Sequence, residues 1–301
     1  MKIFLTGNIK KSNFFAILSD IEKINNKYPH ELYYDNKLLK DSKSKEYSTL
    51  INKCSCSILD YCFDLVICIG GDGSLLSAVR RMGDNQFPIL GIHIGNLGFL
   101  NQANKNNFKD ILKDIFKRKN KLDFHYYSLI KASVIRKTNM ITLLALNDIV
   151  IKHADILRLI KLDLHLASIN ESNYEFSNTY ACDGIIISTP LGSTAYSLSS
   201  GGPIVLHDIN SLIITPISPH SLSARPMIID DKKEIIVEFP DYEDNINLVA
   251  DGQDQHLIDS FSSIKITKSK IKAKFVYSQL MESYFSKLKN KIGFSGTSNK
   301  Y

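Results

Sequence analysis

A short run of glycines around one carboxylate is the feature of this sequence with the clearest chemical meaning. The apolar run Leu65 to Ile69 leads into Gly-Gly-Asp-Gly-Ser at residues 70–74, and a helical pattern from Leu75 to Arg81 follows. A glycine turn between a buried strand and a helix offers free backbone N–H groups and the positive end of the helix dipole, which together bind phosphate. Glycine also lets phosphate oxygens approach the backbone closely. The turn therefore predicts a phosphate-binding loop.

Asp72 is out of place in such a loop, because a carboxylate repels phosphate. A role as general base, or one directed at Mg²⁺, would explain its presence. The alternative is an Asp that only forms the turn or caps the helix. The loop is neither a Walker A sequence nor G-x-G-x-x-G, since no Gly-Lys-Ser/Thr follows and the glycine spacing differs.

A second glycine-bearing turn follows the next predicted strand, Pro88 to Ile94, and reads Gly-Asn-Leu-Gly-Phe-Leu at residues 95–100. Ligands of open α/β sheets bind at the carboxyl ends of parallel strands, so we expect both turns to line one crevice. The alternative is that this turn only punctuates the chain before Phe99 and Leu100 enter the core.

Two polar features stand out in the second half of the sequence. The segment 183–203 is dense in small hydroxyl residues and glycines, and these offer donors to ribose while Tyr196 offers a surface to an adenine ring. Asn147 and Asp148 interrupt an apolar stretch, where Asn can bond the edge of adenine and Asp can accept from ribose hydroxyls. An ordinary polar turn and an intraprotein hydrogen-bonded pair are the respective alternatives.

The secondary-structure elements that must position these residues follow two different sequence patterns, one in each part of the chain. Residues 1 to about 120 alternate short apolar runs with helical patterns such as Phe14 to Ile24, which is typical of βαβ units and a mainly parallel sheet. Successive β-rich segments follow, including Ile141 to Ile151, and predict mostly antiparallel strands. A helical pattern returns at Leu280 to Lys289. We expect an α/β domain over 1–120, completed by 279–301, and a β-rich domain over 121–278.

Composition excludes several classes of protein. The 301 residues are 44% hydrophobic and 23% charged, the balance of a globular enzyme. The apolar runs are far shorter than the roughly 20 residues of a spanning helix, and the N-terminus lacks the pattern of a signal peptide. We expect a cytoplasmic protein without a membrane partner. The net charge of +6 comes from scattered lysines, so no nucleic-acid partner is expected.

The five cysteines predict neither a zinc site nor a disulfide framework. They are odd in number and lack paired C-x-x-C spacing, at positions 54, 56, 62, 68 and 182. A lone C-x-C at Cys54 and Cys56 is set aside as a metal site, and no metal-ligating residues are assigned.

Together these motifs resemble the bacterial NAD kinases. Gly-Gly-Asp-Gly at 70–73, Asn-Leu-Gly-Phe-Leu at 96–100, Asn147-Asp148 and Gly-Ser-Thr-Ala-Tyr-Ser-Leu-Ser at 192–199 occur in the order and spacing of that family. Diacylglycerol and sphingosine kinases and phosphofructokinases share versions of the first motif, whereas its combination with Gly-Ser-Thr-Ala-Tyr is highly specific. The resemblance covers the chain well from about residue 64 and extends over the first sixty residues only in pattern.

The resemblance implies a fold, a reaction and a set of site residues. The fold would be an α/β N-terminal domain and a β-sandwich C-terminal domain, with the C-terminal helix packing back on the first. The reaction would take ATP and NAD to ADP and NADP with a divalent cation, Mg²⁺, in a homo-oligomer, a dimer or a tetramer. Asp72 corresponds to the catalytic aspartate and Gly73 to its neighbour at the nucleotide.

The other correspondences concern NAD. Asn147 and Asp148 match the pair that holds adenine and ribose, and Asp183 matches an aspartate that reaches the nicotinamide end, in relatives from a neighbouring subunit. The adenosine-lining positions are Thr194, Ala195, Tyr196, Ser197, Leu198 and Ser199, with Arg158 and Gln253 as weaker correspondences.

Three positions depart from the family pattern. Ser74 and Leu191 stand where threonine is common, and Asp148 replaces a commoner Glu, which shortens its reach by one methylene.

Three other functions are weighed against this one. A lipid kinase would need an apolar acyl pocket, and the hydroxyl-rich 193–200 segment fits a ribose better. A non-catalytic nucleotide sensor would not need Asp72. A dehydrogenase would carry the dinucleotide fingerprint, which is absent. The sequence leaves open ATP against polyphosphate as donor, the acceptance of NADH, the oligomer size and feedback by NADPH.

Overall fold

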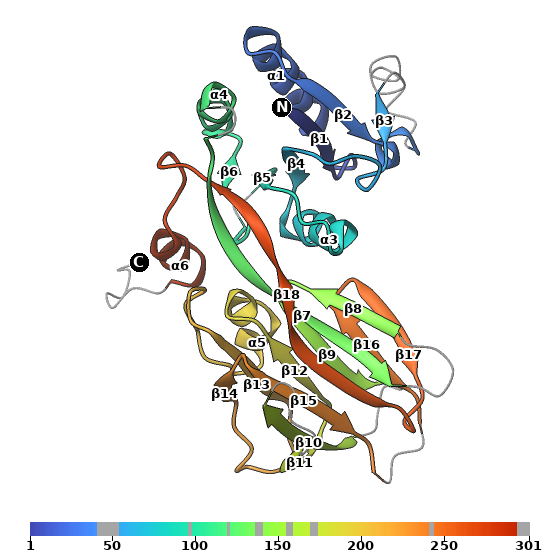
Figure 1. The fold of residues 1–301 in the computed structure, drawn as a ribbon. Helices are drawn as coiled ribbons and strands as arrows, with labels where there is room; N and C mark the ends of the chain where they lie inside the picture. The colour runs from blue at the N-terminus through green and yellow to red at the C-terminus, as the bar shows by residue number, and fades with distance from the viewer. Residues whose placement is uncertain are drawn as a thin grey trace. The chain divides into compact units, whose positions relative to one another are not determined.

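The chain folds into two compact units, which a computed structural model describes for residues 1–40, 54–95, 98–118, 121–135, 141–154, 159–168, 174–240 and 244–293. The first unit comprises Met1–Tyr126 with Lys274–Tyr301, and the second comprises Tyr127–Ala273. Both boundaries fall inside long strands, β7 (Asp123–Ile135) and β18 (Ser263–Tyr277) (Figure 1). The sequence placed these boundaries at 120/121 and 278/279.

The first unit is built on a parallel sheet. Its strands, in their order across the sheet, are β5 (Ile89–His93), β4 (Leu65–Gly70), β1 (Lys2–Gly7), β2 (Glu31–Asp35) and β3 (Ser55–Cys56). β6 (Ala103–Asn104) and the end of β18 also pair with β5, both in parallel. Every residue of β4 and of β5 is buried, as expected where helices cover a parallel sheet. The predicted α/β class of this half is confirmed.

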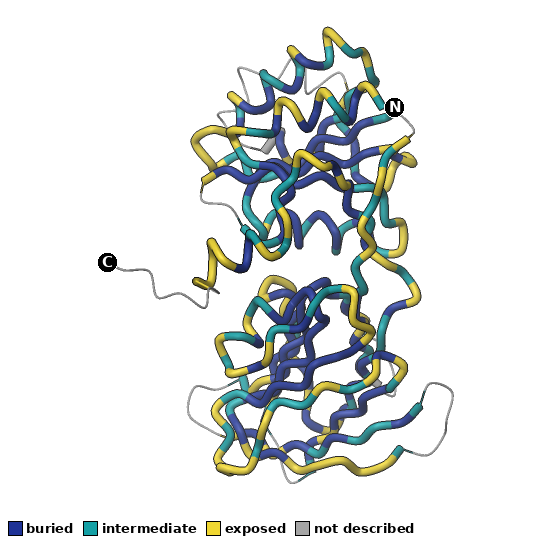
Figure 2. The backbone as a smooth tube through the Cα atoms, turned by 90° about the vertical axis from the view of Figure 1, so that its left-hand side faces the viewer, coloured by how far each residue is buried: buried dark blue, intermediate teal, exposed yellow. Residues whose placement is uncertain are grey.

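The helices of this unit turn apolar faces to its core. They are α1 (Phe14–Lys27), α3 (Asp72–Met82), α4 (Phe108–Arg118) and α6 (Tyr284–Ile292), with a short 3₁₀ turn, η1 (Asn36–Lys40). The buried residues of α1 are those of the predicted helical face, Phe14, Ile17, Leu18, Ile21 and Ile24. Figure 2 shows buried positions along strands and inner helix faces. Within the described part of the chain, no helix combines the length and the apolar character needed to cross a membrane.

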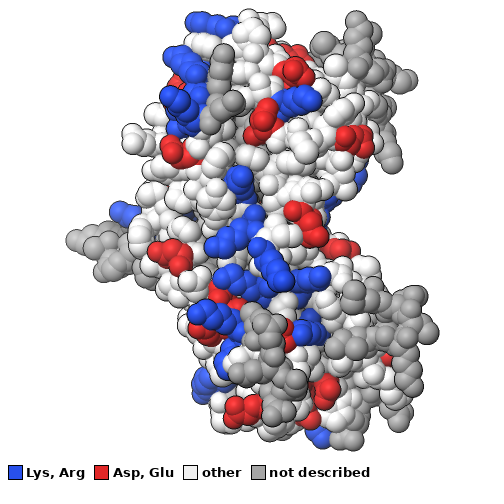
Figure 3. All heavy atoms as spheres, in the orientation of Figure 1, with Lys and Arg blue, Asp and Glu red and all other residues white. Residues whose placement is uncertain are grey.

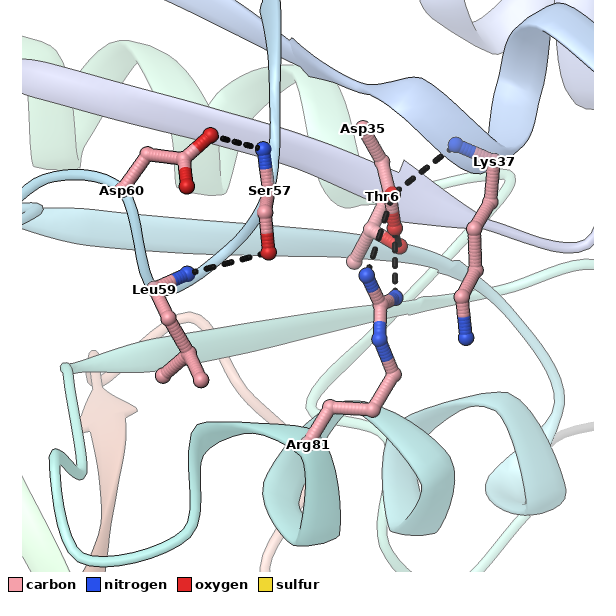
Figure 4. A network of polar contacts seen from close by, with 7 residues as sticks. All are labelled: Thr6, Asp35, Lys37, Ser57, Leu59, Asp60 and Arg81. Atoms are coloured by element: carbon pink, nitrogen blue, oxygen red, sulfur yellow. Dashed lines mark hydrogen bonds and ion pairs between the residues drawn. The ribbon is translucent and has the colours of Figure 1, made fainter.

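A buried ion pair fixes α3 against the sheet (Figure 4). Arg81, near the end of α3, donates to both carboxylate oxygens of Asp35 at the end of β2, with the second contact at 3.0 Å. Thr6 of β1 donates to the same carboxylate at 2.6 Å. Asp35 is 1% exposed, and such a two-pronged guanidinium contact fixes geometry as well as charge. The helix that begins at Asp72 is therefore anchored at its far end.

The second unit is an antiparallel β-sandwich, which confirms the fold implied by the family resemblance. One sheet contains, in order, β14 (Met227–Asp230), β13 (Ser211–Ile217), β12 (Gly184–Ser188), β9 (Asp148–His153), β16 (Ile246–Ala250) and β17 (Asp254–Ile258). The other contains β11 (Glu175–Cys182), β10 (Ile160–Ser168), β15 (Lys233–Glu238), β18, β7 and β8 (Ile141–Ala145). Side chains of both sheets form one apolar core, including Ile151 and Ile187 from the first and Leu164 and Val237 from the second.

Three predicted elements differ from the structure. The stretch Ile141 to Ile151 is two strands rather than one, because the chain leaves β8 and joins the other sheet as β9. The helix predicted from Leu75 begins at Asp72. The last helix begins at Tyr284 rather than Leu280, because the Ser283 hydroxyl accepts the Ser286 N–H at 3.2 Å and caps it there.

Candidate functional site

The glycine loop joins the central strand of the first unit to α3. Gly71 is the extended residue before the helix, and its side-chain position is open, with His93 Nε2 at 3.7 Å as the nearest atom to a Cβ placed there. Gly70 has no such room, since a Cβ would lie 2.4 Å from the Ser74 hydroxyl. Gly73, in the first turn of α3, is exposed. The loop thus has the strand, turn and helix start that a phosphate-binding loop requires.

The Asp72 carboxylate is held by the second glycine-bearing turn. Its Oδ2 accepts the N–H of Phe99 at 2.7 Å, and its Oδ1 accepts the N–H groups of Leu100 and Asn101 at 3.2 and 3.3 Å. The Asn101 side-chain amide donates to the same Oδ1 at 2.7 Å. Gly98 is required beside them, because a Cβ there would lie 1.9 Å from Asp72 Oδ1. These donors offset the cost of placing a carboxylate beside a phosphate-binding loop.

This arrangement bears on two alternatives left open by the sequence. Asp72 does not cap its own helix, since the N-cap residue is Gly71 and Asp72 bonds across to residues 99–101. The second turn is more than punctuation, because its backbone holds the carboxylate of the first. Asn96 and Leu97 of that turn lie outside the described residues.

Two further basic groups border the Asp72 site, and the sequence did not single out either. Lys287 of α6 donates to the backbone carbonyls of Phe99 and Asn101 at 3.0 and 2.7 Å. Burial lowers the pKa of the Lys287 ammonium, against the opposing charges of Asp72 and Glu282. Burial likewise lowers the pKa of the His93 imidazole at the end of β5, which favours its neutral form. Lys287 also confirms that the last helix packs on the first domain.

In the second unit, Asn147 and Asp148 stand where the chain passes from β8 to β9. The carboxylate of Asp251, which follows β16, accepts the N–H groups of Leu146, Asn147 and Asp148 at 3.1, 2.8 and 3.4 Å. The Asp251 N–H in turn donates to the Asp148 carbonyl at 2.9 Å. Asp251 has a positive φ of 50°, a conformation that Asp adopts more readily than most residues. The sequence pattern assigned no role to Asp251.

The side chains of the Asn147–Asp148 pair are buried, and one oxygen of Asn147, Oδ1, lacks a hydrogen bond among the described residues. Asp148 is 4% exposed, and its burial, reinforced by the Asp251 charge, raises the pKa of the Asp148 carboxyl to about 7. A buried amide oxygen without a partner favours a ligand contact over the intraprotein pair.

The hydroxyl-rich segment packs directly on this pair. Thr189 donates its hydroxyl to the Leu146 carbonyl at 2.7 Å and its N–H to the Asn147 carbonyl at 2.9 Å. Gly192 touches the same peptide so closely that a Cβ would lie 2.1 Å from the Asn147 carbonyl oxygen. The structure therefore brings together residues 147–148 and the start of the Gly-Ser-Thr-Ala-Tyr motif.

The rest of that motif forms two short turns, η3 (Leu191–Thr194) and α5 (Tyr196–Ser199). Ser197 is buried and its hydroxyl bonds that of Thr215 at 2.9 Å, so it serves the packing of the turn. Tyr196 is 45% exposed and Ser199 is exposed, whereas Thr194, Ala195 and Leu198 are partly buried. Tyr196 and Ser199 are therefore the motif residues most accessible to a ligand.

One predicted residue, Asp183, lies away from this place. Asp183 precedes β12 whereas Thr189 follows it, so the two lie at opposite ends of a strand about 17 Å long. Pairing of Ser188 with Asp148 places the Asn147–Asp148 pair at the Thr189 end. Gln253 is exposed on the turn that holds Asp251, between β16 and β17. Arg158 lies outside the described residues.

The distribution of basic side chains and of possible metal ligands differs from that of the motif residues. Lys and Arg gather on the face drawn in Figure 3, and in the second unit β18 carries Lys265, Lys268, Lys270 and Lys272. Two of them are paired within the fold, Lys265 with Glu234 at 2.5 Å and Lys268 with Asp231. The described residues contain no group of three or more His, Cys, Asp and Glu side chains that could hold a metal ion.

Comparisons with known proteins identify the family of the chain. Residues 3–120 match the ATP-NAD kinase N-terminal domain and residues 146–278 match the ATP-NAD kinase C-terminal domain. The NAD kinase of Flavobacterium johnsoniae is 32% identical over 297 residues, which is 97% of each chain. That of Sulfurimonas denitrificans is 32% identical over 274 residues, covering 90% of this chain and 89% of the relative.

Solved structures show the same fold. Yeast NADH kinase, solved with NADH, superposes with a TM-score of 0.84 at 22% identity, covering 99% of this chain and 89% of that one. An NAD kinase from Archaeoglobus fulgidus, solved with ATP, gives a TM-score of 0.71 at 24% identity, covering 97% and 98%. The resemblance drawn from the sequence, and with it the expectation of an NAD kinase enzyme, is confirmed by the family models and relatives. The chain belongs to the ATP-NAD kinase family.

Proposed function

We propose that the chain transfers the γ-phosphoryl group of ATP to the 2′-hydroxyl of the adenosine ribose of NAD, giving NADP and ADP. The observation that carries this proposal is the Asp72 carboxylate, which four hydrogen bonds hold at the first residue of the helix after the glycine loop. A carboxylate fixed beside a phosphate-binding loop is suited to accept a proton from a hydroxyl that attacks a phosphoryl group.

The step balances with Asp72 as the base. A bond forms between the 2′-oxygen and the γ-phosphorus, the bond from that phosphorus to the bridging oxygen breaks, and ADP leaves with the electron pair. The hydroxyl proton passes to Asp72. Its Oδ1 already accepts three of the hydrogen bonds and Oδ2 only one, so Oδ2 keeps a lone pair for the incoming hydroxyl.

The donor phosphates are proposed to bind at the backbone of residues 70–74. The open position at Gly71 and the start of α3 support this, because free N–H groups and the helix dipole attract phosphate. Mg²⁺ is expected to enter with ATP, held mainly by phosphate oxygens and water, which fits a described site without a cluster of protein ligands. The cation would neutralise charge on the phosphates.

The acceptor is proposed to bind in the second unit. The unpartnered Asn147 Oδ1 can accept from the adenine amino group, and Asp148 can bond the ribose hydroxyls. Thr194, Ala195, Tyr196, Leu198 and Ser199 then border the adenosine. Transfer requires that the ribose held there reaches Asp72.

The remaining parts of the proposal follow from the family. Asp183 stands at the far end of β12 from Thr189, and we propose that it reaches the nicotinamide end of NAD bound to a neighbouring subunit in a homo-oligomer. Gly73, Gln253 and Arg158 stay as proposed nucleotide contacts, and a cytoplasmic location stays as expected from the sequence.

A single set of incubations tests the function. Purified protein with Mg²⁺ and either ATP or inorganic polyphosphate is given NAD, NADH or vesicles containing diacylglycerol, and NADP, NADPH and phosphorylated lipid are measured. We expect NADP from NAD and ATP. Phosphorylated lipid without NADP would support the lipid kinase, and binding of NAD or ATP without any product would support the nucleotide sensor.

A further inference from the structure

Lys287 is a buried charge for which the phosphoryl transfer has no direct use. It lies on α6, is 8% exposed, and its ammonium donates to the carbonyls of Phe99 and Asn101. Burying an ammonium is costly unless it is hydrogen-bonded or paired with an opposite charge. The position therefore calls for an explanation beyond packing.

The two carbonyls that Lys287 binds belong to the turn that holds Asp72. The peptide group between Phe99 and Leu100 is bonded at both ends, because its carbonyl accepts from Lys287 at 3.0 Å and its N–H donates to Asp72 Oδ1 at 3.2 Å. Asn101 bonds both groups through two different peptide groups, with its carbonyl on Lys287 and its N–H and side-chain amide on Asp72. The turn thus lies between a positive and a negative group.

Hydrogen bonds of this kind strengthen one another. A peptide group whose carbonyl accepts from a cation becomes a better N–H donor to an anion on its other side. The Lys287 ammonium also restrains the carbonyls of residues 99 and 101, so the N–H groups of residues 99–101 stay directed at the Asp72 carboxylate. An Asp72 carboxylate with a weakened set of donors would be free to turn away from the reacting hydroxyl.

We propose that Lys287 is a positioning residue, which holds the turn at residues 98–101 so that its N–H groups fix the Asp72 carboxylate for the transfer. The proposal rests on the proposed function for its kinetic consequence, whereas the link through the turn can be tested without any substrate. Through Lys287, the C-terminal helix α6 helps to position the Asp72 carboxylate.

The variants Lys287→Met and Lys287→Arg test this link. Lys287→Met removes the donor and the charge at similar length, whereas Lys287→Arg keeps both. Lys289→Met, on the exposed side of the same helix, is the matched control. Amide hydrogen exchange of Leu100 and Asn101 is measured with β4 as the internal reference, together with kcat and KM for NAD.

We expect Lys287→Met to exchange at Leu100 and Asn101 about tenfold faster or more, with β4 unchanged. Its kcat should fall about 10- to 100-fold, because a small displacement of a reacting group has effects of that order, while KM for NAD changes less than about threefold. Lys287→Arg should restore most of both properties. Lys289→Met should match the wild-type protein.

Two results would overturn the proposal. One is a folded Lys287→Met protein with unchanged exchange at Leu100 and Asn101 and a kcat within about twofold of wild type. The other is equally faster exchange throughout the first unit, which marks a purely structural residue. If Lys287→Met does not fold, Lys287→Gln, which keeps a donor without the charge, takes its place under the same criteria. A wild-type protein that makes no NADP defeats the proposed function and leaves the exchange result to decide on Lys287.

Discussion

Two aspartates in different units of this molecule hold the backbone in the same way. The Asp72 carboxylate accepts the N–H groups of residues 99–101, and the Asp251 carboxylate accepts those of residues 146–148. In each case the carboxylate fixes a turn after a strand, and a glycine beside the turn, Gly98 or Gly192, leaves no room for a side chain.

The two sites differ in the charged group that lies beside the turn bound by the aspartate. At Asp72 the clasped turn also binds the Lys287 ammonium, so negative and positive groups share the same peptides. At Asp251 the neighbouring group is a second carboxylate, and Asp148 has its pKa raised to about 7. We propose that the same backbone arrangement positions the reactive carboxylate in one unit and the contacts to NAD in the other. We expect damage at the first to affect turnover and damage at the second to affect NAD binding.

The largest expected effect is that of Asp72→Asn, which should lower kcat by about 10²- to 10⁴-fold, the usual contribution of a general base. NAD binding should persist, because the proposed NAD contacts lie in the second unit. Rates of NADP formation and calorimetric titration with NAD measure the two separately. A variant with a near-normal rate would refute the assignment of the base.

The pH dependence of stability isolates the carboxylate pair of the second unit. Asp148 binds its proton more tightly in the folded protein, at a pKa of about 7, than in the unfolded chain, at about 4. The folded state therefore holds more protons between these values, and raising the pH through this window lowers the free energy of unfolding, by up to about 4 kcal/mol. Asp148→Asn should lack this loss.

Urea unfolding at pH 4 and pH 8 measures this difference. We expect Asp148→Asn to gain stability relative to wild type as the pH rises. The same substitution at exposed Asp208, in the same unit, is the control and should follow the wild type. A constant gap between Asp148→Asn and wild type at both pH values contradicts the raised pKa.

Alanine substitutions at Gly98 and Gly192 test the comparison between the two units. Gly98→Ala must push the Asp72 carboxylate away and should lower kcat about 10- to 100-fold with a smaller change in KM. Gly192→Ala must displace the Asn147 peptide and should mainly raise KM for NAD by a similar factor. Each variant is the control for the other in steady-state kinetics. If both variants change the same parameter, the division of labour between the two units is wrong.

The smallest of these effects is expected for Asp251→Asn. The amide can still accept from part of the 146–148 turn, so the loss of stability should be about 1 to 3 kcal/mol. Removing the Asp251 charge should also lower the pKa of Asp148 and reduce the pH dependence described above. Urea unfolding at both pH values tests this, and an unchanged pH dependence would show that burial alone sets the Asp148 pKa.

Much of the fold follows from local pattern. The buried strands around Leu65–Gly70 and Ile89–His93, and the apolar face of α1, are short-range features that the sequence states directly. Edge strand β11 was not predicted, because most of its residues are exposed and no apolar run marks it. The break between β8 and β9 was also missed, because both sides of Asn147 are apolar and the turn depends on Asp251, more than a hundred residues away.

The sequence by itself determined which residues we propose for the chemistry. The glycine loop, Asp72, the Asn147–Asp148 pair and the 192–199 motif are recognisable because their residue types and spacing are local. Tertiary structure alone decided that Phe99 to Asn101 bind Asp72, that Lys287 binds the same turn and that Asp251 binds the turn at residues 146–148. The physical reason is that these contacts use backbone N–H and carbonyl groups. Every residue except proline carries both, so residue type leaves no trace of them until the chain brings distant segments together.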